Sequence, residues 1–296
     1  MSSISLFFEV LIGGLLSGVM YTLVALGFVL IFKASGVFNF AQGAMVLFAA
    51  LNYVGFSELG LPWWAALLAT LAAMVALAIA IERAVLRSLL GQDHMIVFMA
   101  TIGLSIFIEG LAQLLWGTEV RGLELGLPEE PIFLGDMLIS SADLMVAAVA
   151  ALLVLALSLF FTWTRIGRAL RAVAEDTQAA QVAGVSLGMI WTVVWSAAGI
   201  IALVAGLVWG ARLGVQFALT LVALKALPVM ILGGFNSIPG TIVAGLLIGA
   251  SEKLAEVYIG PYVGGGIENW FPYALAITVL IFRPAGLFGS NQVTRV

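Results

Sequence analysis

Residues 10–32 read VLIGGLLSGVMYTLVALGFVLIF, which is 23 consecutive positions without Asp, Glu, Lys or Arg. About 20 apolar residues suffice for a helix to cross a bilayer, so this run predicts a membrane-spanning helix. Further runs with few or no charges occupy residues 34–57, 59–81, 95–116, 144–164, 189–209, 226–251 and 270–282. The sequence therefore predicts an all-α, polytopic transmembrane helical bundle with eight or nine spans, some of them broken or re-entrant.

The composition excludes whole classes of protein. Of the 296 residues, 63% are hydrophobic and 9% are charged, whereas soluble domains contain roughly 45–50% and 25%. A soluble enzyme is therefore excluded, and residues 1–296 are expected to form a single transmembrane domain. The chain has no Cys and one His, so we expect neither a metal site nor a cofactor of its own. Its 12 Lys and Arg are scattered, which argues against a nucleic-acid partner.

Basic residues predict the orientation of the chain, because Lys and Arg accumulate on cytoplasmic connections. On alternate connections, eight Lys and Arg residues fall on one side of the membrane and two on the other. Lys225 and Lys253 lie inside apolar runs and are not counted. This split places connections 82–94 and 165–188 in the cytoplasm and the acidic connection 119–143 outside. We therefore expect a multi-pass protein of the plasma membrane (the bacterial inner membrane), with its C-terminus in the cytoplasm.

The inner connection 165–188 reads RIGRALRAVAEDTQAAQVAGVSLG and is longer than a turn between two helices needs. Its arginines, its Ala-rich sequence and then Gly184 predict a short surface helix that this glycine ends. An alternative is that the arginines only keep this connection on the cytoplasmic side, which would explain the basic first half of the sequence. They would not explain the acidic pair Glu175 and Asp176 or the alanine run that follows.

Two of the apolar runs are interrupted by polar residues and glycines. Asn39 and Gln42 interrupt the run 34–57, and Asn236 and Ser237 interrupt the run 226–251. Non-helical backbone at membrane depth is tolerated only where it is buried in protein or lines a cavity, so these residues are candidates for a translocation pathway. The alternative is that they cap helix ends or hold helices together.

Two ionisable residues lie within or beside apolar runs, Glu109 and Lys225. Such residues are functional candidates by default. A buried structural pair, or a position near the interface with a snorkelling lysine, would also explain them. Farther along, Lys253 and Glu256 stand at i,i+3 spacing and are expected to pair with each other.

Four short stretches carry a family resemblance. They are RAVAEDTQAAQVAG (171–184), GVFNFAQG (36–43), VMILGGFNSIPG (229–240) and RPAGLFG (283–289). In this order they resemble the coupling loop and the signature segments of permeases of the branched-chain amino-acid ABC importer family, in the subtype that pairs with a second, related permease. The resemblance covers the chain from end to end.

The resemblance implies a role and a set of partners. Arg171, Glu175, Asp176 and Gly184 belong to the stretch that implies docking on an ATPase. The implied complex adds a second related permease, two ATPase subunits and an extracytoplasmic substrate-binding protein. No G-x-x-x-x-G-K-[ST] pattern occurs in the chain, so the partner ATPases would bind the ATP and this chain would not be an enzyme.

The implied substrate is a small amino acid, most specifically a branched-chain one such as leucine, isoleucine or valine. Two positions depart from the family pattern: Asn236 stands where Gly is common, and Gln42 stands where His is frequent. Both lie in polar breaks, so an ABC permease for urea or short amides is an alternative. A secondary transporter or channel is a further alternative. It would need ion-coupling or selectivity groups at membrane depth, and only Glu109 and Lys225 are available there.

Overall fold

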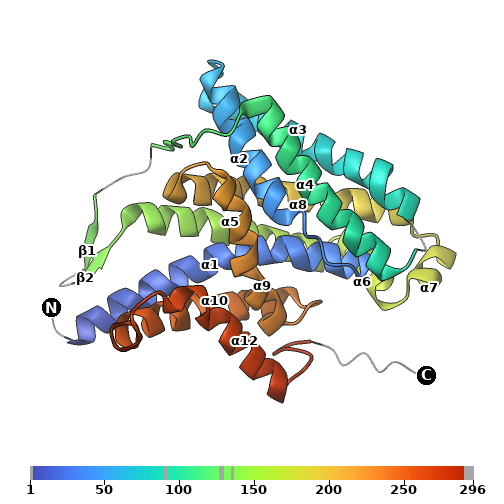
Figure 1. Ribbon diagram of the computed structural model, residues 1–296. Coiled ribbons are helices and arrows are strands. Elements are labelled where there is room, and N and C mark those ends of the chain that lie inside the picture. The colour runs from blue at the N-terminus through green and yellow to red at the C-terminus, as the bar shows by residue number, and fades with distance from the viewer. Residues whose placement is uncertain (1–2, 90–91, 127–129, 135–136, 290–296) are drawn as a thin grey trace. The chain divides into compact units, whose positions relative to one another are not determined.

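The computed structural model describes residues 3–89, 92–126, 130–134 and 137–289, and most of these are helical (Figure 1). The α-helices are α1 (Ser3–Ser35), α2 (Gln42–Glu58), α3 (Trp63–Ile81), α4 (His94–Trp116), α5 (Ser141–Trp163), α6 (Arg165–Glu175), α7 (Thr177–Val182), α8 (Leu187–Leu213), α9 (Val222–Gly233), α10 (Ile238–Tyr258), α11 (Gly260–Val263) and α12 (Phe271–Phe282). Short helical turns are η1 (Glu82–Leu86), η2 (Arg87–Leu89), η3 (Phe217–Leu221) and η4 (Ile267–Asn269). The strands β1 (Ile132–Leu134) and β2 (Met137–Ile139) form an antiparallel pair with Ile132 opposite Ile139.

Six helices in the described ranges are long and apolar enough to cross a membrane. They are Ile4–Ser35, Trp63–Leu89, Met95–Trp116, Ser141–Trp163, Leu187–Leu213 and Ile238–Tyr258. The other predicted spans form shorter helices, because α2 has 17 residues and α12 has 12. A transmembrane helical architecture is therefore supported, whereas the predicted count of eight or nine spans is not confirmed.

The chain divides into two compact units, each built from segments that are distant in sequence. Unit 1 combines Met1–Ala25, Leu125–Leu155 and Lys225–Val296. Unit 2 combines Leu26–Glu124 and Ala156–Leu224.

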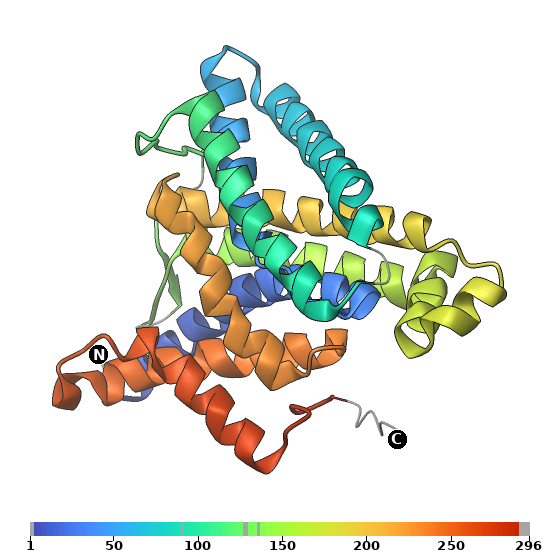
Figure 2. The same ribbon diagram turned by 45° about the vertical axis from the view of Figure 1, so that its right-hand side comes forward.

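The centre of unit 2 is α2, which is buried from Gln42 to Gly55. It packs against α3, α4, α8 and η3 (Figures 1 and 2). Gly206 of α8 makes this packing close, since a Cβ added there would lie 2.6 Å from the carbonyl oxygen of Val46. A helix that is buried on every side needs no polar face, which explains why the buried part of α2 is apolar apart from the two amides Gln42 and Asn52.

In unit 1, the first half of α1 packs closely against α10. A Cβ added to Gly14 would lie 2.6 Å from the carbonyl oxygen of Gly249, and one added to Gly18 would collide with the carbonyl of Gly245. Small residues at four-residue spacing therefore let these two backbones approach each other, as is common between membrane helices.

Candidate functional site

The connection 165–188 folds into two helices, α6 and α7, instead of the single surface helix predicted from the sequence. The backbone is extended at Asp176, with φ −152° and ψ 104°, and the Asp176 carboxylate accepts the N–H of Ala179 at 2.9 Å. Aspartate side chains compete with helical hydrogen bonds in this way and favour N-terminal caps. Asp176 therefore ends α6 and begins α7.

Gly184 terminates α7, as predicted. Its φ is +87°, a conformation that residues with a Cβ rarely adopt. The N–H groups of Gly184 and Val185 donate to the carbonyls of Gln181 and Ala180, at 2.9 and 3.0 Å. This Schellman arrangement satisfies carbonyls that the helix end would otherwise leave free. Hydrogen bonds thus fix both ends of α7.

The arginines of α6 fasten the start of this connection to the end of α5. Arg171 donates to the carbonyls of Phe161 and Thr162 at 3.2 and 3.1 Å, and Arg168 donates to that of Trp163 at 3.3 Å. Basic side chains suit a helix C-terminus, where carbonyls are free and the dipole is negative. The arginines therefore make structural contacts whatever their effect on orientation.

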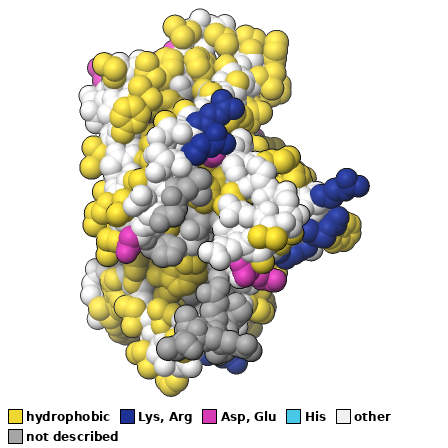
Figure 3. Space-filling view, turned by 90° about the vertical axis from the view of Figure 1, so that its right-hand side faces the viewer, with side chains coloured by type: hydrophobic (Ala, Val, Ile, Leu, Met, Phe, Trp, Pro, Cys, Tyr) yellow, Lys and Arg dark blue, Asp and Glu magenta, His cyan; other side chains and the backbone are white. Residues whose placement is uncertain are grey.

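One side of α6 and α7 is buried and the other is open. The buried side includes Leu170, Val173 and Ala180. The opposite side, called the exposed loop face below, consists of Glu175, Asp176, Gln178, Gln181 and Val182. Val182 is apolar and 91% exposed. Figure 3 shows this side of the molecule, where charged side chains gather beside uncharged and apolar surface.

Two amides lie at the first polar break, residues 36–41 between α1 and α2: Asn39 lies within it, and Gln42, the first residue of α2, follows it directly. Both are fully buried. Asn39 Oδ1 accepts the N–H of Ala41 at 3.0 Å, and Gln42 Nε2 donates to the carbonyl of Ala198 at 3.4 Å. The remaining amide atoms, Asn39 Nδ2 and Gln42 Oε1, have no partner in the described part of the chain. One donor and one acceptor are therefore buried and unused, which is costly for polar groups.

Aromatic rings flank the first break. Phe28 stacks on Phe38 with 4.7 Å between ring centroids, and Phe40 meets Phe38 and Phe98 edge-on at 4.8 and 5.1 Å. The Thr101 hydroxyl donates to the carbonyl of Phe38 at 3.2 Å. The unused amide atoms therefore belong to a segment framed by apolar rings.

The second polar break, residues 234–237, is the turn between α9 and α10 that the sequence predicts. The Ser237 hydroxyl accepts the N–H of Gly240 at 3.0 Å and so caps α10. Gly233 packs so closely on Gly240 that an added Cβ would lie 2.6 Å from the Gly240 carbonyl carbon. Asn236 is half-buried, and its side chain makes no hydrogen bond to any described residue.

The C-terminal segment 285–289 closes the second break from its other side. The N–H groups of Leu287 and Phe288 donate to the carbonyls of Leu232 and Gly233, at 2.8 and 3.3 Å. These carbonyls end α9 and would otherwise lack partners. Two of the stretches that carry the family resemblance thus pack together through their backbones.

Glu109 lies in α4 with its side chain partly exposed. Its contact is with the hydroxyl of Ser105, 3.5 Å from its Oε1, and no cationic side chain in the described ranges lies within 4 Å of it. The neighbouring Ile106 and Phe107 are exposed apolar side chains. The structure therefore gives Glu109 no buried ion pair.

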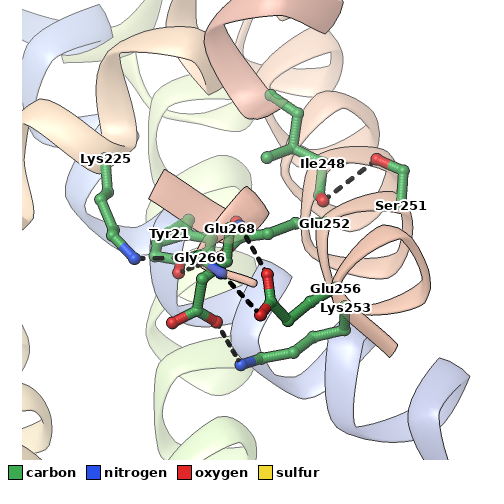
Figure 4. A network of polar contacts seen from close by, with 9 residues as sticks. All are labelled: Tyr21, Lys225, Ile248, Ser251, Glu252, Lys253, Glu256, Gly266 and Glu268. Atoms are coloured by element: carbon green, nitrogen blue, oxygen red, sulfur yellow. Dashed lines mark hydrogen bonds and ion pairs between the residues drawn. The ribbon is translucent and has the colours of Figure 1, made fainter. Parts of the chain in front are cut away.

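Lys225 pairs with Glu252 of α10, at 3.9 Å between Nζ and Oε1 (Figure 4). The hydroxyl of Tyr21 in α1 donates to the same oxygen at 3.2 Å. Glu252 is 1% exposed, and its Oε2 has no partner among the described residues. A buried pair was one of the explanations open for Lys225, but Glu252 was not predicted to be its partner.

A signal for Glu252 exists in the sequence. Gly245, Gly249 and Glu252 recur at i, i+4 and i+7, so they share one face of α10. Because the two glycines indicate close helix packing, a carboxylate on the same face is expected to be buried and to need partners.

Lys253 pairs with Glu268, at 2.8 Å between Nζ and Oε2, and the predicted pairing with Glu256 is wrong. Glu256 instead accepts the N–H groups of Gly266 and Glu268, at 3.0 and 3.1 Å. An i,i+3 ion pair is worth little on a helix surface, whereas turn N–H groups need acceptors. The hydrogen bond from Lys253 holds the pKa of Glu268 below its usual range.

Comparison with known proteins tests the family resemblance of the four motif stretches independently. Residues 10–283 match the family described as branched-chain amino acid transport system, permease component. The high-affinity branched-chain amino acid transport system permease protein BraD of Pseudomonas aeruginosa is 29% identical, over 98% of both chains. The corresponding protein LivH of Escherichia coli is 27% identical, also over 98% of both chains.

A solved structure, PsaBC from Streptococcus pneumoniae in complex with Fab, aligns with 91% of this chain and 89% of its own, at 15% identity. Its TM-score of 0.46 is too low to support any argument about this chain. The family match instead covers nearly the whole sequence and includes the first three motif stretches and Arg283, the first residue of the fourth. The chain therefore belongs to the family of branched-chain amino acid transport system permease components.

Proposed function

We propose that the chain is a permease subunit of an ATP-driven ABC importer for small amino acids, with branched-chain amino acids as substrates. The match of residues 10–283 to the permease family carries this proposal. The names of BraD and LivH supply the substrate class. The chain has no phosphate-binding loop of its own, so ATP hydrolysis is assigned to two separate ATPase subunits.

The proposed complex contains this chain, a second related permease, two ATPase subunits and an extracytoplasmic substrate-binding protein. The chain would lie in the inner membrane with its C-terminus in the cytoplasm, as the distribution of Lys and Arg indicates. The six long helices would span the bilayer, and shorter apolar helices such as α2 and α12 would add crossing or re-entrant segments.

The exposed loop face is the proposed contact with an ATPase subunit. A loop that transmits ATPase closure must be rigid, and α7 has hydrogen-bonded caps at both ends. It must also be joined to the membrane helices, and Arg171 ties α6 to the end of α5. Val182 offers an apolar anchor in the middle of a polar surface, as interface anchors commonly do.

The pathway is proposed to pass the polar breaks. A branched aliphatic amino acid needs an apolar path with a few polar groups for its charged head. The first break offers an unused donor on Asn39 and an unused acceptor on Gln42, within a segment flanked by aromatic rings. Asn236 adds a free amide at the second break.

The test is reconstitution of the complete complex in vesicles with ATP on the ATPase side. Labelled leucine should enter only when ATP, loaded binding protein and both ATPase subunits are present. Labelled urea and a labelled sugar serve as substrate controls and should not enter. If the permeases alone move leucine at the full rate without ATPase subunits, the chain is a facilitator and the proposal is wrong.

Two substitutions that change the charge of the exposed loop face test ATPase coupling separately from the translocation pathway. Glu175→Lys and Val182→Asp alter the exposed loop face without removing the Asp176 cap, so both variants should insert normally. Glu175→Lys would create a like-charge contact, which can cost several kcal/mol, and Val182→Asp would bury an unpaired charge where an apolar anchor is expected. ATPase association should therefore weaken, or loaded binding protein should no longer stimulate ATP hydrolysis. Glu119→Lys, an exposed acid on the connection predicted to lie outside, is the matched control. If both loop variants keep wild-type ATPase association and wild-type stimulation of ATP hydrolysis, the loop only connects two helices and the proposed contact is wrong.

A further inference from the structure

Lys225 and Glu252 form an incomplete ion pair. The 3.9 Å between Lys225 Nζ and Glu252 Oε1 exceeds the 2.7–3.2 Å of a normal N–H···O hydrogen bond. Glu252 Oε1 is hydrogen-bonded by Tyr21, whereas Oε2 is buried without a partner in the described chain. Among the described residues, neither the Lys225 ammonium nor Glu252 Oε2 has a hydrogen-bond partner, and Figure 4 shows the groups around them.

A second ion pair one residue along α10 shows how the same helix closes a structural pair. Lys253 Nζ lies 2.8 Å from Glu268 Oε2, within hydrogen-bond distance. The neighbouring Glu256 uses both of its oxygens to accept backbone N–H groups. The unused capacity at Glu252 is therefore not a general property of this part of the chain.

The position and access of the loose pair suit a transported ligand. Glu252 lies inside the candidate span Ile238–Tyr258, where ionisable residues commonly mark substrate or ion pathways. The Lys225 side chain is 32% exposed and that of Glu252 is 2% exposed. Lys225 is therefore the more accessible of the two groups, and Glu252 is the more deeply buried.

The unused groups form a donor and acceptor pair that complements a zwitterion. The Lys225 ammonium can donate to a carboxylate, and Glu252 Oε2 can accept from an ammonium group. A ligand with a single charge would leave one member of the pair unsatisfied. We propose that Lys225 and Glu252 form a binding subsite for the charged head of a zwitterionic α-amino acid, which binds its carboxylate at Lys225 and its ammonium at Glu252 Oε2.

This inference rests on the proposed function, because it assigns the head-group contacts of the same transported substrate. Tyr21 acts here as a positioning residue. Its hydroxyl holds Oε1, which leaves Oε2 free for the ligand.

The experiment measures leucine moved per ATP hydrolysed by the complete complex in vesicles with loaded binding protein. Glu252→Gln preserves the shape of the side chain and an acceptor for Tyr21, and Lys225→Met preserves the length of the lysine. The double variant Lys225→Met/Glu252→Gln leaves no unpaired charge buried, so it should fold even if a single variant does not. Lys253→Met removes the neighbouring structural pair and is the matched control.

We expect each variant of the loose pair to lower leucine per ATP at least tenfold, while assembly and stimulated ATP hydrolysis stay within twofold of wild type. Lys253→Met should keep the wild-type ratio. A wild-type ratio in the double variant overturns the subsite, and so does a parallel loss of uptake and ATP hydrolysis, which would indicate a purely structural pair. If the wild-type complex does not take up leucine with ATP, the proposed function itself fails.

A second measurement tests the zwitterion directly. Labelled leucine is bound to the complete complex without binding protein and displaced by unlabelled leucine, leucinamide or 4-methylpentanoate. Leucinamide lacks the carboxylate and 4-methylpentanoate lacks the amine, so both should compete at least tenfold more weakly than leucine. Equal competition by all three compounds would show that only the aliphatic side chain is recognised and would contradict the proposal.

Discussion

The two polar breaks have the same signature in the sequence but are stabilised in opposite ways. At the break 234–237, Ser237 caps α10, and Leu287 and Phe288 donate to the carbonyls at the end of α9. At the break 36–41, each of the two buried amides has one atom bonded and one atom unused. The two interrupted regions therefore differ in whether their buried polar groups keep unpaired hydrogen-bond donors and acceptors.

The difference separates a structural interruption from a candidate binding position. A break whose groups are all paired gains nothing from a ligand, whereas unused buried groups gain a hydrogen bond when a polar ligand or water reaches them. The first break is therefore the better candidate for contact with substrate. Asn236, whose amide is free and half-buried, is the exception within the second break.

The largest expected effect comes from breaking the close packing at the second break. In Gly240→Val, the added side chain would collide with the carbonyl of Gly233 and approach the Ser237 hydroxyl to within 2.9 Å. We expect the free energy of unfolding to fall by about 3 kcal/mol, the upper range for overpacking. Thermal unfolding of the purified protein in detergent measures it. Gly13→Ala is the control, because a Cβ there meets nothing within 4 Å, and a stable Gly240→Val protein would contradict the packing account.

At the first break, the expected effect is on transport instead of stability. Gln42→Leu removes the weak 3.4 Å bond to Ala198 together with the unused Oε1, so the two changes should nearly cancel in the free energy of unfolding. Leucine uptake should nevertheless fall by about tenfold, which corresponds to roughly 1.4 kcal/mol. Normal uptake with normal stability would place Gln42 among residues that only pack helices.

The smallest expected effect is the loss of one cap at the second break. Ser237→Ala removes the acceptor for the N–H of Gly240 and should cost about 1 kcal/mol of stability, with leucine uptake per folded protein unchanged. Ser237→Asn offers an acceptor again and should recover most of the loss. A specific fall in uptake for Ser237→Ala would show that this hydroxyl does more than cap a helix.

Much of the fold follows from the sequence because membrane helices are encoded locally. Charge-free runs predicted the helices, and the interruption of the run 226–251 at Asn236 and Ser237 predicted the break before α10. The predicted count of eight or nine spans is not confirmed, because an apolar run does not show where the backbone leaves a helix, as at residues 36–41. The division of the loop at Asp176 was missed because aspartate can continue a helix or cap the next one.

Contacts between distant segments could not be predicted from local patterns. The backbone bonds from Leu287 and Phe288 join stretches some fifty residues apart and have no side-chain signature. Lys253 pairs with Glu268 and not with Glu256, because the turn after α10 places backbone N–H groups next to Glu256. The position of this turn is not encoded in the local sequence. The candidate amides were found from the sequence, but which of their atoms remain unused required the structure.

Cysteine accessibility tests most directly the claim that the first break lies on the transport path. The chain contains no Cys, so Gln42→Cys and Ser237→Cys each give this subunit a single thiol, whose labelling can be followed on this subunit within the complete complex. Gln42 is fully buried in this structure, so we predict that Gln42→Cys reacts with a small thiol reagent only during ATP-driven turnover, and that Ser237→Cys reacts equally with and without ATP. A Gln42→Cys thiol that stays unreactive while leucine is being transported would contradict the account.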